Sequence, residues 1–155
     1  MMRRKVLYED LEKIEEIMKK CDACFVGMAD ENNQPYVVPF NFGYKDKCIY
    51  LHSAQNGKKM DILRKNNKVC VSFSTDHQIA FQHPDVACSY LLKYRSVQAF
   101  GHVEFIEDPA EKVKVMNIIM QKYSGRDFKY GPPAIKEVAC YKVVIDKIYG
   151  KEFEY

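Results

Sequence analysis

Hydrophobic and polar residues alternate through much of the chain, a pattern typical of half-buried β-strands. The alternation predicts strands over 24–29, 35–44, 48–52, 69–74, 90–106 and 138–148. Spacings of three and four predict helices over 8–20, over 58–65 and after residue 108. Since strands and helices do not alternate regularly, a parallel doubly wound sheet is not expected. The pattern predicts a mainly β, antiparallel barrel, closed or split, of about six or seven strands with three peripheral helices.

The chain changes its period within residues 49–65, IYLHSAQNGKKMDILRK. A strand end is followed by small and polar residues and then by a helix that opens with Lys58 and Lys59. Cations are disfavoured at a helix N-terminus, where the backbone already presents partial positive charge. Two lysines there are explained if an anion binds among them, with free N–H groups and Ser53 as further donors. The alternative is an ordinary solvated first helical turn.

Length and composition limit the class of protein. The 155 residues are 47% hydrophobic and 29% charged, which predicts one globular domain spanning residues 1–155. The net charge of +3 is scattered, with no basic stripe, so nucleic-acid binding is not expected. No apolar run reaches the ~18 residues of a membrane span, and no secretory signal is visible. We therefore expect a cytoplasmic protein that does not bind a membrane.

Six cysteines raise the question of disulfides, redox chemistry or metal binding. Cys21 and Cys24 form a CxxC pair, but it follows a helix instead of opening one, so the thiolate lacks the stabilisation that a redox site needs. No second ligand pair at zinc-finger spacing accompanies it. Residues 75–89 contain His77, His83 and Cys88 at irregular spacing, and their structure cannot be predicted. We predict no metal site and no role for the CxxC pair.

Familiar catalytic and nucleotide-binding motifs are absent from the sequence. There is no GxGxxG, GxxxxGK[ST], GxSxG or HExxH pattern. The anion turn and the neighbouring segment Val38-Pro39-Phe40-Asn41 remain as candidate chemistry. A cofactor with a flat apolar ring and a phosphate tail would suit such a surface.

Three segments together resemble a known family. The order PYVVPFNFGY (35–44), IYLHSAQNGKK (49–59) and YRSVQAFGHVEFIED (94–108) is similar to the flavin-binding split barrels related to pyridoxamine 5'-phosphate oxidase. Within that group the chain most resembles the nitroimidazole-resistance proteins, and MRRK and GKEFEY at its two ends extend the match over nearly its whole length. The oxidase proper has further arginine and histidine ligands near its C-terminus, whereas no arginine follows Arg126 here. Oxidation of pyridoxamine phosphate is therefore not implied.

The resemblance implies a homodimer with FMN at its interface and an oxidoreductase that acts on a small-molecule electron acceptor such as a nitroaromatic. It implies a phosphate site, a strand along the flavin ring, a histidine beside the ring and a segment that closes the pocket. The phosphate residues are Ser53, Ala54, Lys58 and Lys59, and the strand along the ring is Val38, Pro39, Phe40 and Asn41. The histidine is His52, and the segment that closes the pocket is Tyr94, Arg95, Ser96 and Val97. His52 is the one candidate catalytic residue, and no metal is implied.

Each candidate also has an ordinary structural explanation. Asn41 and Ser96 can satisfy backbone groups, Arg95 can be an exposed strand residue, and His52 can be a hydrogen-bonded strand end. Two other function classes stay open at this point. One is a flavin-binding module without turnover. The other is a haem-binding split barrel with an axial ligand among His52, His77, His83 and His102.

Overall fold

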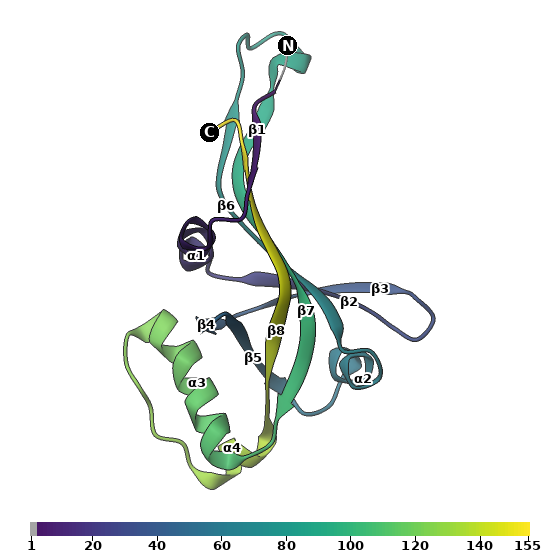
Figure 1. Ribbon diagram of the computed structural model, residues 1–155, viewed down its shortest axis with the longest axis vertical. Helices are drawn as coiled ribbons and strands as arrows, with labels where there is room; N and C mark the ends of the chain where they lie inside the picture. The colour runs from purple at the N-terminus through teal and green to yellow at the C-terminus, as the bar shows by residue number, and fades with distance from the viewer. Residues whose placement is uncertain (1–2) are drawn as a thin grey trace.

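The computed structural model describes residues 3–155, which form an eight-stranded antiparallel sheet with four α-helices and one short 3-10 helix (Figure 1). The predicted start of the domain at residues 1 and 2 lies outside the described residues. The strands are β1 Lys5–Tyr8, β2 Cys24–Ala29, β3 Pro35–Phe40, β4 Gly43–Lys45, β5 Cys48–Ala54, β6 Lys68–Ala80, β7 Leu91–Ile106 and β8 Val138–Phe153. The helices are α1 Leu11–Lys20, α2 Lys58–Lys65, α3 Pro109–Ser124 and α4 Pro132–Glu137, and the 3-10 helix is Ala87–Ser89.

The strand order explains why the barrel is split. The sheet runs β3-β2-β6-β7-β8-β5-β4, with β1 added on β8. Strands β3 and β4 lie at opposite ends of this order, yet only Asn41 and Phe42 separate them in sequence. Three Cα–Cα steps span at most about 11 Å. The two ends of the sheet must therefore curl toward each other without forming a ladder, which confirms the predicted mainly β, antiparallel split barrel.

The region 35–44 differs from the prediction, which treated it as one strand. The chain leaves one edge of the sheet after Phe40 and joins the other edge at Gly43. Phe42, which is 1% exposed, lies between the two strands and packs edge-on against Phe73 at 5.0 Å between ring centroids. The break lets this aromatic side chain enter the core. Pro39, which has no N–H to donate to a neighbouring strand, lies on the edge strand β3.

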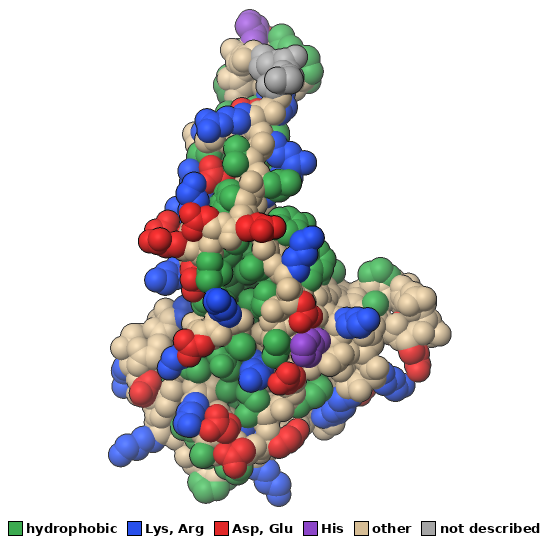
Figure 2. Space-filling model, in the orientation of Figure 1, with side chains coloured by type: hydrophobic (Ala, Val, Ile, Leu, Met, Phe, Trp, Pro, Cys, Tyr) green, Lys and Arg blue, Asp and Glu red, His purple; other side chains and the backbone are tan. Residues whose placement is uncertain are grey.

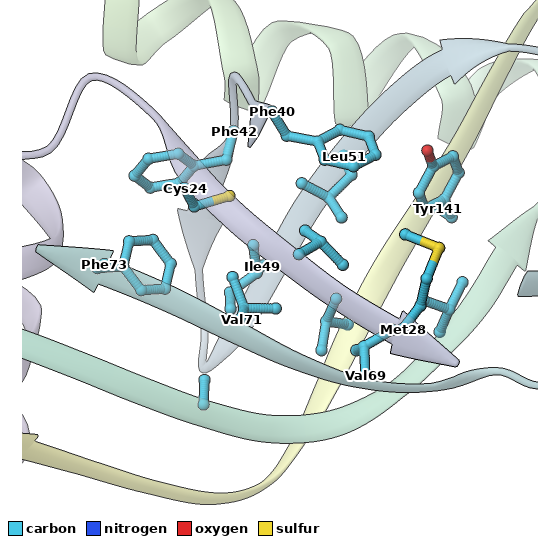
Figure 3. Close-up of a cluster of buried hydrophobic side chains, with 14 of the residues drawn as sticks. Cys24, Met28, Phe40, Phe42, Ile49, Leu51, Val69, Val71, Phe73 and Tyr141 are labelled. Atoms are coloured by element: carbon cyan, nitrogen blue, oxygen red, sulfur yellow. The ribbon is translucent and has the colours of Figure 1, made fainter. Parts of the chain in front are cut away.

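The core fills the curl of the sheet (Figure 3). Alternate residues of β2, β5, β6, β7 and β8 point inward, as period-two patterning requires. Fully buried members include Cys24, Val26, Ile49, Leu51, Val71, Phe73, Val97, Ala99, Tyr141 and Val143. Helix α1 adds Ile14, Ile17 and Met18, and α2 adds Met60, Ile62 and Leu63. Both helices therefore cover the open parts of the barrel.

Strands β6 and β7 continue past the barrel as a long arm (Figure 1), and Arg3 Nη2 donates to the Cys88 carbonyl near its tip at 2.9 Å. Most of the segment 75–89, which the sequence did not explain, belongs to this arm. The β6–β7 register shifts between Thr75 and Gln78, which marks a bulge. A second shift falls at Gly101, where a Cβ would overlap the carbonyl oxygen of Val144. A residue without a Cβ is therefore required at this shift.

Helix boundaries follow local capping chemistry. Helix α3 starts where the sequence predicted, with Pro109 at its first position and the Asp108 carboxylate accepting from the Glu111 N–H at 3.0 Å. Helix α1 starts later than predicted because Asp10 caps it, accepting from the Glu12 N–H at 3.0 Å. Helix α4 and strand β1 were not predicted. No helix in the part of the chain that the structure describes is long and apolar enough to cross a membrane.

Candidate functional site

The predicted anion turn joins β5 to α2, and local hydrogen bonds fix its shape. Gly57 precedes the helix with φ at +132°, a conformation that side chains rarely adopt. Arg64 Nη2 donates to the Gln55 carbonyl at 2.8 Å, and Gln55 Nε2 donates to the Val138 carbonyl at 2.9 Å. No side chain caps the N-terminus of α2. The first N–H groups of the helix are therefore left to bind solvent or an anion.

The two lysines that open α2 both reach toward β3. Lys58 Nζ lies 4.6 Å from the ring centroid of Tyr36, and Lys59 Nζ lies 4.8 Å from that of Phe40. These cation–π contacts hold the ammonium groups against aromatic faces on one side. The structure thus brings the predicted phosphate residues together with one residue of the predicted ring strand, Phe40.

A buried tyrosine positions Ser53 through a hydrogen bond. The Tyr141 hydroxyl donates to Ser53 Oγ at 3.0 Å, and Tyr141 is fully buried. Burial is the main cause that raises the pKa of Tyr141 to about 12, while the hydrogen bond with Ser53 opposes the shift. The phenol therefore stays protonated and remains a donor. Ser53 Oγ in turn lies 3.0 Å from the Ala54 carbonyl, to which it donates.

His52 lies on β5 beside these groups and is half-buried. Burial first, and the charge of Lys59 second, lower the pKa of His52 below its ordinary value of 6.5. The imidazole is therefore largely neutral at pH 7. A neutral imidazole can donate a hydrogen bond from one nitrogen and accept one at the other. His52 can therefore act as a donor or as an acceptor toward the polar edge of a ligand ring.

The strand predicted to follow a flavin ring shows two faces. Val38 and Phe40 point toward the core, and Phe40 meets Tyr141 edge-on at 6.2 Å between centroids. Figure 3 shows these two rings at one end of the core cluster. Pro39 and Asn41 are exposed. A flat ligand along β3 would therefore meet backbone groups and the outward residues more than the Phe40 ring.

The segment Tyr94–Val97 lies far from the phosphate turn within one chain. Through β8, residue Ile106 of β7 is in register with His52 of β5. Ser96 is ten residues further along β7, which at ~3.3 Å per residue is about 33 Å. The structure therefore does not bring the two predicted parts of the site together in a single chain.

Within this segment Arg95 is engaged in the chain's own contacts. Arg95 Nη1 lies 2.7 Å from Asp76 Oδ2, its Nε lies 3.7 Å from Glu152 Oε1, and its guanidinium stacks 3.9 Å from the ring centroid of Tyr155. Tyr94 stacks on Phe153 at 5.6 Å between centroids. Val97 is fully buried in the core, and Ser96 is buried. Tyr94 is the half-exposed member on the outer face of the sheet.

Sequence reasoning missed two residues of this site. Tyr36 shares a face of β3 with Val38 and Phe40, so the alternation could have suggested it. Tyr141 lies 88 residues from Ser53 and carries no local signal. Only the β5–β8 pairing places Leu51 beside Tyr141 and brings that ring beneath the turn.

The cysteines lack the surroundings of a redox centre. Burial raises the pKa of Cys24 to about 12, and it also raises the pKa of Cys21. Cys21 Sγ donates to the Ile17 carbonyl at 3.3 Å. Over residues 3–155 no group of three His, Cys, Asp or Glu side chains has a geometry that could hold a metal ion.

Comparisons with known proteins agree with this architecture. The family description pyridoxamine 5'-phosphate oxidase matches residues 10–152. The crystal structure of a candidate 5-nitroimidazole antibiotic resistance protein from Bacteroides thetaiotaomicron is 42% identical, with a TM-score of 0.88 over 99% of this chain and 90% of that one. Among curated proteins no sequence matches the chain significantly.

More distant structures share the fold alone. A flavocytochrome from Azotobacter vinelandii is 21% identical, with a TM-score of 0.80 over 94% of this chain and 68% of that one. A FAD-binding protein from Mesorhizobium loti is 18% identical, with a TM-score of 0.70 over 99% of this chain and 100% of that one. The family match over residues 10–152 and the 42% identity over nearly the whole chain show that this protein belongs to the pyridoxamine 5'-phosphate oxidase family of split barrels.

Proposed function

We propose that this protein binds FMN and passes electrons to a small acceptor such as a nitroaromatic compound. The observation that carries the proposal is the anion site at α2, where Lys58 and Lys59 flank a helix N-terminus that has no side-chain cap. The relative described as a nitroimidazole-resistance protein supports the acceptor class. The FAD-binding structure of the same fold supports a flavin as the cofactor class.

The residues present fit the cofactor in kind and place. The phosphate would be held by Ser53, Lys58, Lys59 and the backbone near Ala54. The two ammonium groups would donate charge-assisted hydrogen bonds to its oxygens. The flavin would supply the electron-transfer chemistry, and the protein would supply position and polarity. The ring would lie along Val38, Pro39, Phe40 and Asn41, with neutral His52 able to donate or accept at its edge.

The working form in this proposal is a homodimer. Ser96 lies about 33 Å along the strands from the level of His52, so a flavin whose phosphate is held at the turn would meet Tyr94 and Ser96 of a second copy. The outer face of the sheet also exposes large apolar side chains. Phe25 is 48%, Val37 63% and Phe100 40% exposed. Contiguous exposed apolar surface on a sheet is typical of an interface.

The charge distribution gives no support to a nucleic-acid partner. Figure 2 shows Lys and Arg side chains interspersed with Asp and Glu over the visible face, without a basic stripe. Ion pairs between opposite charges recur across the chain, including Lys65 with Glu31 at 3.2 Å. A small-molecule acceptor therefore remains the proposed partner besides the second copy.

The cofactor experiment is an absorption spectrum with mass spectrometry of the ligand released from purified protein. The proposal expects a flavin spectrum and the mass of FMN. A sharp Soret band would favour the haem alternative instead. Turnover with a chemical reductant and a nitroaromatic acceptor then separates a reductase from a flavin carrier, since a carrier binds without turnover.

The assembly experiment is light scattering at micromolar concentration. We expect a dimer that buries well over the ~1,200 Å² of a weak contact. A monomer that keeps its flavin would refute the two-copy site. Substituting Val37→Lys on the outer face places a charge in the proposed interface, and it should weaken both the dimer and flavin binding. The control Lys129→Glu changes charge on an exposed loop residue and should leave both unchanged.

A further inference from the structure

A lysine side chain is buried at the start of helix α3. Lys112 is 5% exposed, and over residues 3–155 it has no ion pair with an acidic side chain. Burying a charge without an opposite charge is costly, so lysine side chains normally extend their ammonium groups into solvent. The burial of this ammonium group therefore needs an explanation beyond packing.

Carbonyl groups at the end of helix α4 hold the Lys112 ammonium group. Its Nζ donates to the Ile135 carbonyl at 3.1 Å and to the Val138 carbonyl at 2.8 Å. Carbonyl groups in the last turn of a helix lack intrahelical partners, so they are free to accept these bonds. Val138 is the residue at which α4 ends and β8 begins. Lys112 thus fixes α3 to this junction.

The Val138 carbonyl also accepts a hydrogen bond from the turn between β5 and α2. Gln55 Nε2 donates to it at 2.9 Å, so one oxygen with two lone pairs binds both side chains. The Gln55 backbone carbonyl in turn accepts from Arg64 Nη2 at 2.8 Å. The side chain of Gln55 is therefore fixed by Val138 and its backbone by Arg64.

These hydrogen bonds control a part of the chain that packing leaves open. Gln55, Arg64 and Lys112 line one cavity of about 210 Å³, so close packing does not hold them on that side. Only Asn56 and Gly57 separate Gln55 from the first residue of α2, whose N-terminus has no side-chain cap. A displacement of Gln55 would therefore move the N–H groups that open the helix.

We propose that Lys112 is a positioning residue for the flavin phosphate. It holds the Val138 carbonyl, this carbonyl orients Gln55, and Gln55 sets the path of the turn whose N–H groups bind the phosphate. Lys112 acts through these hydrogen bonds and does not contact the flavin. The inference rests on the proposed function, because the position of the turn matters only if a phosphate binds there. It goes further by assigning a role to a buried lysine and to helix α4.

The first test compares FMN with riboflavin by fluorescence titration of the flavin-free protein. Lys112→Met keeps an unbranched side chain and removes the donor, so FMN affinity should fall roughly fivefold while riboflavin affinity stays near the parent value. A merely structural role would weaken both ligands alike, so the ratio of the two affinities is the decisive quantity. The control Lys114→Met removes an exposed lysine from the same helix and should keep the parent's ratio.

Gln55→Ala is the second variant, and it tests the same link if Lys112→Met does not fold. It should lower the ratio too. The double variant should lose little more than either single variant, because both changes interrupt one chain of contacts. An unchanged ratio in Lys112→Met or in Gln55→Ala would overturn the proposal, and so would losses that add in the double variant. FMN binding by the parent would in those cases leave the proposed function standing.

Amide hydrogen exchange over residues 55–59 of the flavin-free protein tests the positioning apart from FMN. Lys112→Met should exchange faster there than the parent, and Lys114→Met should not, since a loosened turn opens more often. A parent that binds no FMN, together with faster exchange in Lys112→Met, would refute the flavin function and leave Lys112 as the residue that fixes the turn. Equal exchange in Lys112→Met and the parent would overturn the positioning role. The two failures are therefore distinguishable.

Discussion

Removing both lysines from the start of α2 tests the proposed phosphate site most directly. Each charge-assisted hydrogen bond is worth about 1.5–3 kcal/mol, and ~1.4 kcal/mol corresponds to a factor of ten in affinity. Lys58 is exposed, so salt screening favours the lower end of this range. Two contacts of about 1.5 kcal/mol each give roughly a hundredfold loss of FMN affinity in Lys58→Ala/Lys59→Ala.

Riboflavin supplies the internal comparison because it lacks the phosphate. Its affinity should barely change in the double variant, whereas general damage to the fold would weaken both ligands. The matched control is Lys68→Ala/Lys129→Ala, which removes the same charge from two exposed positions that lie outside the start of α2. This control should keep FMN affinity within about twofold, since long-range charge is screened at moderate salt. Fluorescence titration measures the affinity of the parent, the double variant and the control for both ligands.

The stability of the ligand-free variant follows from two opposing terms. Removing a cation from a helix N-terminus gains about 0.3–1 kcal/mol per charge. Each lysine also faces an aromatic ring, at 4.6 Å for Tyr36 and 4.8 Å for Phe40, and such contacts contribute about 0.5–1 kcal/mol. The terms nearly cancel, so the free energy of unfolding should change little. Equal FMN affinity in the double variant and the parent would remove the physical support for a phosphate site.

Three further outcomes follow from the described contacts. Tyr141→Phe removes the hydrogen bond to Ser53, so urea titration should show a stability loss of about 0.5–1.5 kcal/mol, with FMN affinity reduced as well. The pKa of His52 is lower in the folded state than in the unfolded state, so the unfolded chain binds more protons below about pH 6.5. The parent should therefore lose more stability than His52→Gln between pH 7.5 and 5.5. Equal losses of stability in the two proteins would contradict this. Thiol labelling mapped by mass spectrometry should modify exposed Cys88 first, because Cys24 is buried and its pKa is about 12; early labelling of Cys24 would contradict this.

Much of the fold was predictable because its elements are defined by local patterns. Helix α2 spans Lys58–Lys65 as predicted, and β7 ends at Ile106 as predicted. The two halves of 35–44 were merged because both alternate, and only the strand order shows that the chain changes edges between them. The arm was not predicted because exposed residues such as Ile79 and Phe81 have no core to set their period.

The buried face of α3 shows the same limit. Spacings of three and four along the helix fit a buried stripe of Val113, Met116, Met120 and Tyr123. Instead, Val115, Met116 and Ile119 are the buried apolar residues, and Tyr123 is 40% exposed. The helix is apolar on several sides, so its period alone did not fix the face. Tyr123 instead donates its hydroxyl proton to the Asp22 carbonyl at 2.7 Å. Tertiary packing decided which face is buried.

The candidate site was predictable only where its parts adjoin in sequence. The turn carried its own signal, since two lysines at a helix start oppose the helix dipole. Tyr94–Val97 was assigned to the same pocket as the turn only by the family resemblance, and Ser96 lies about 33 Å along β7 from the level of His52. If both segments contact one flavin, each flavin joins two chains. FMN binding then stabilises the dimer, and dimer formation raises FMN affinity by the same free energy. FMN affinity should then rise with protein concentration across the dimer dissociation range. A concentration-independent affinity for a dissociating protein would mean that one chain holds the flavin alone and that Tyr94–Val97 serves the arm.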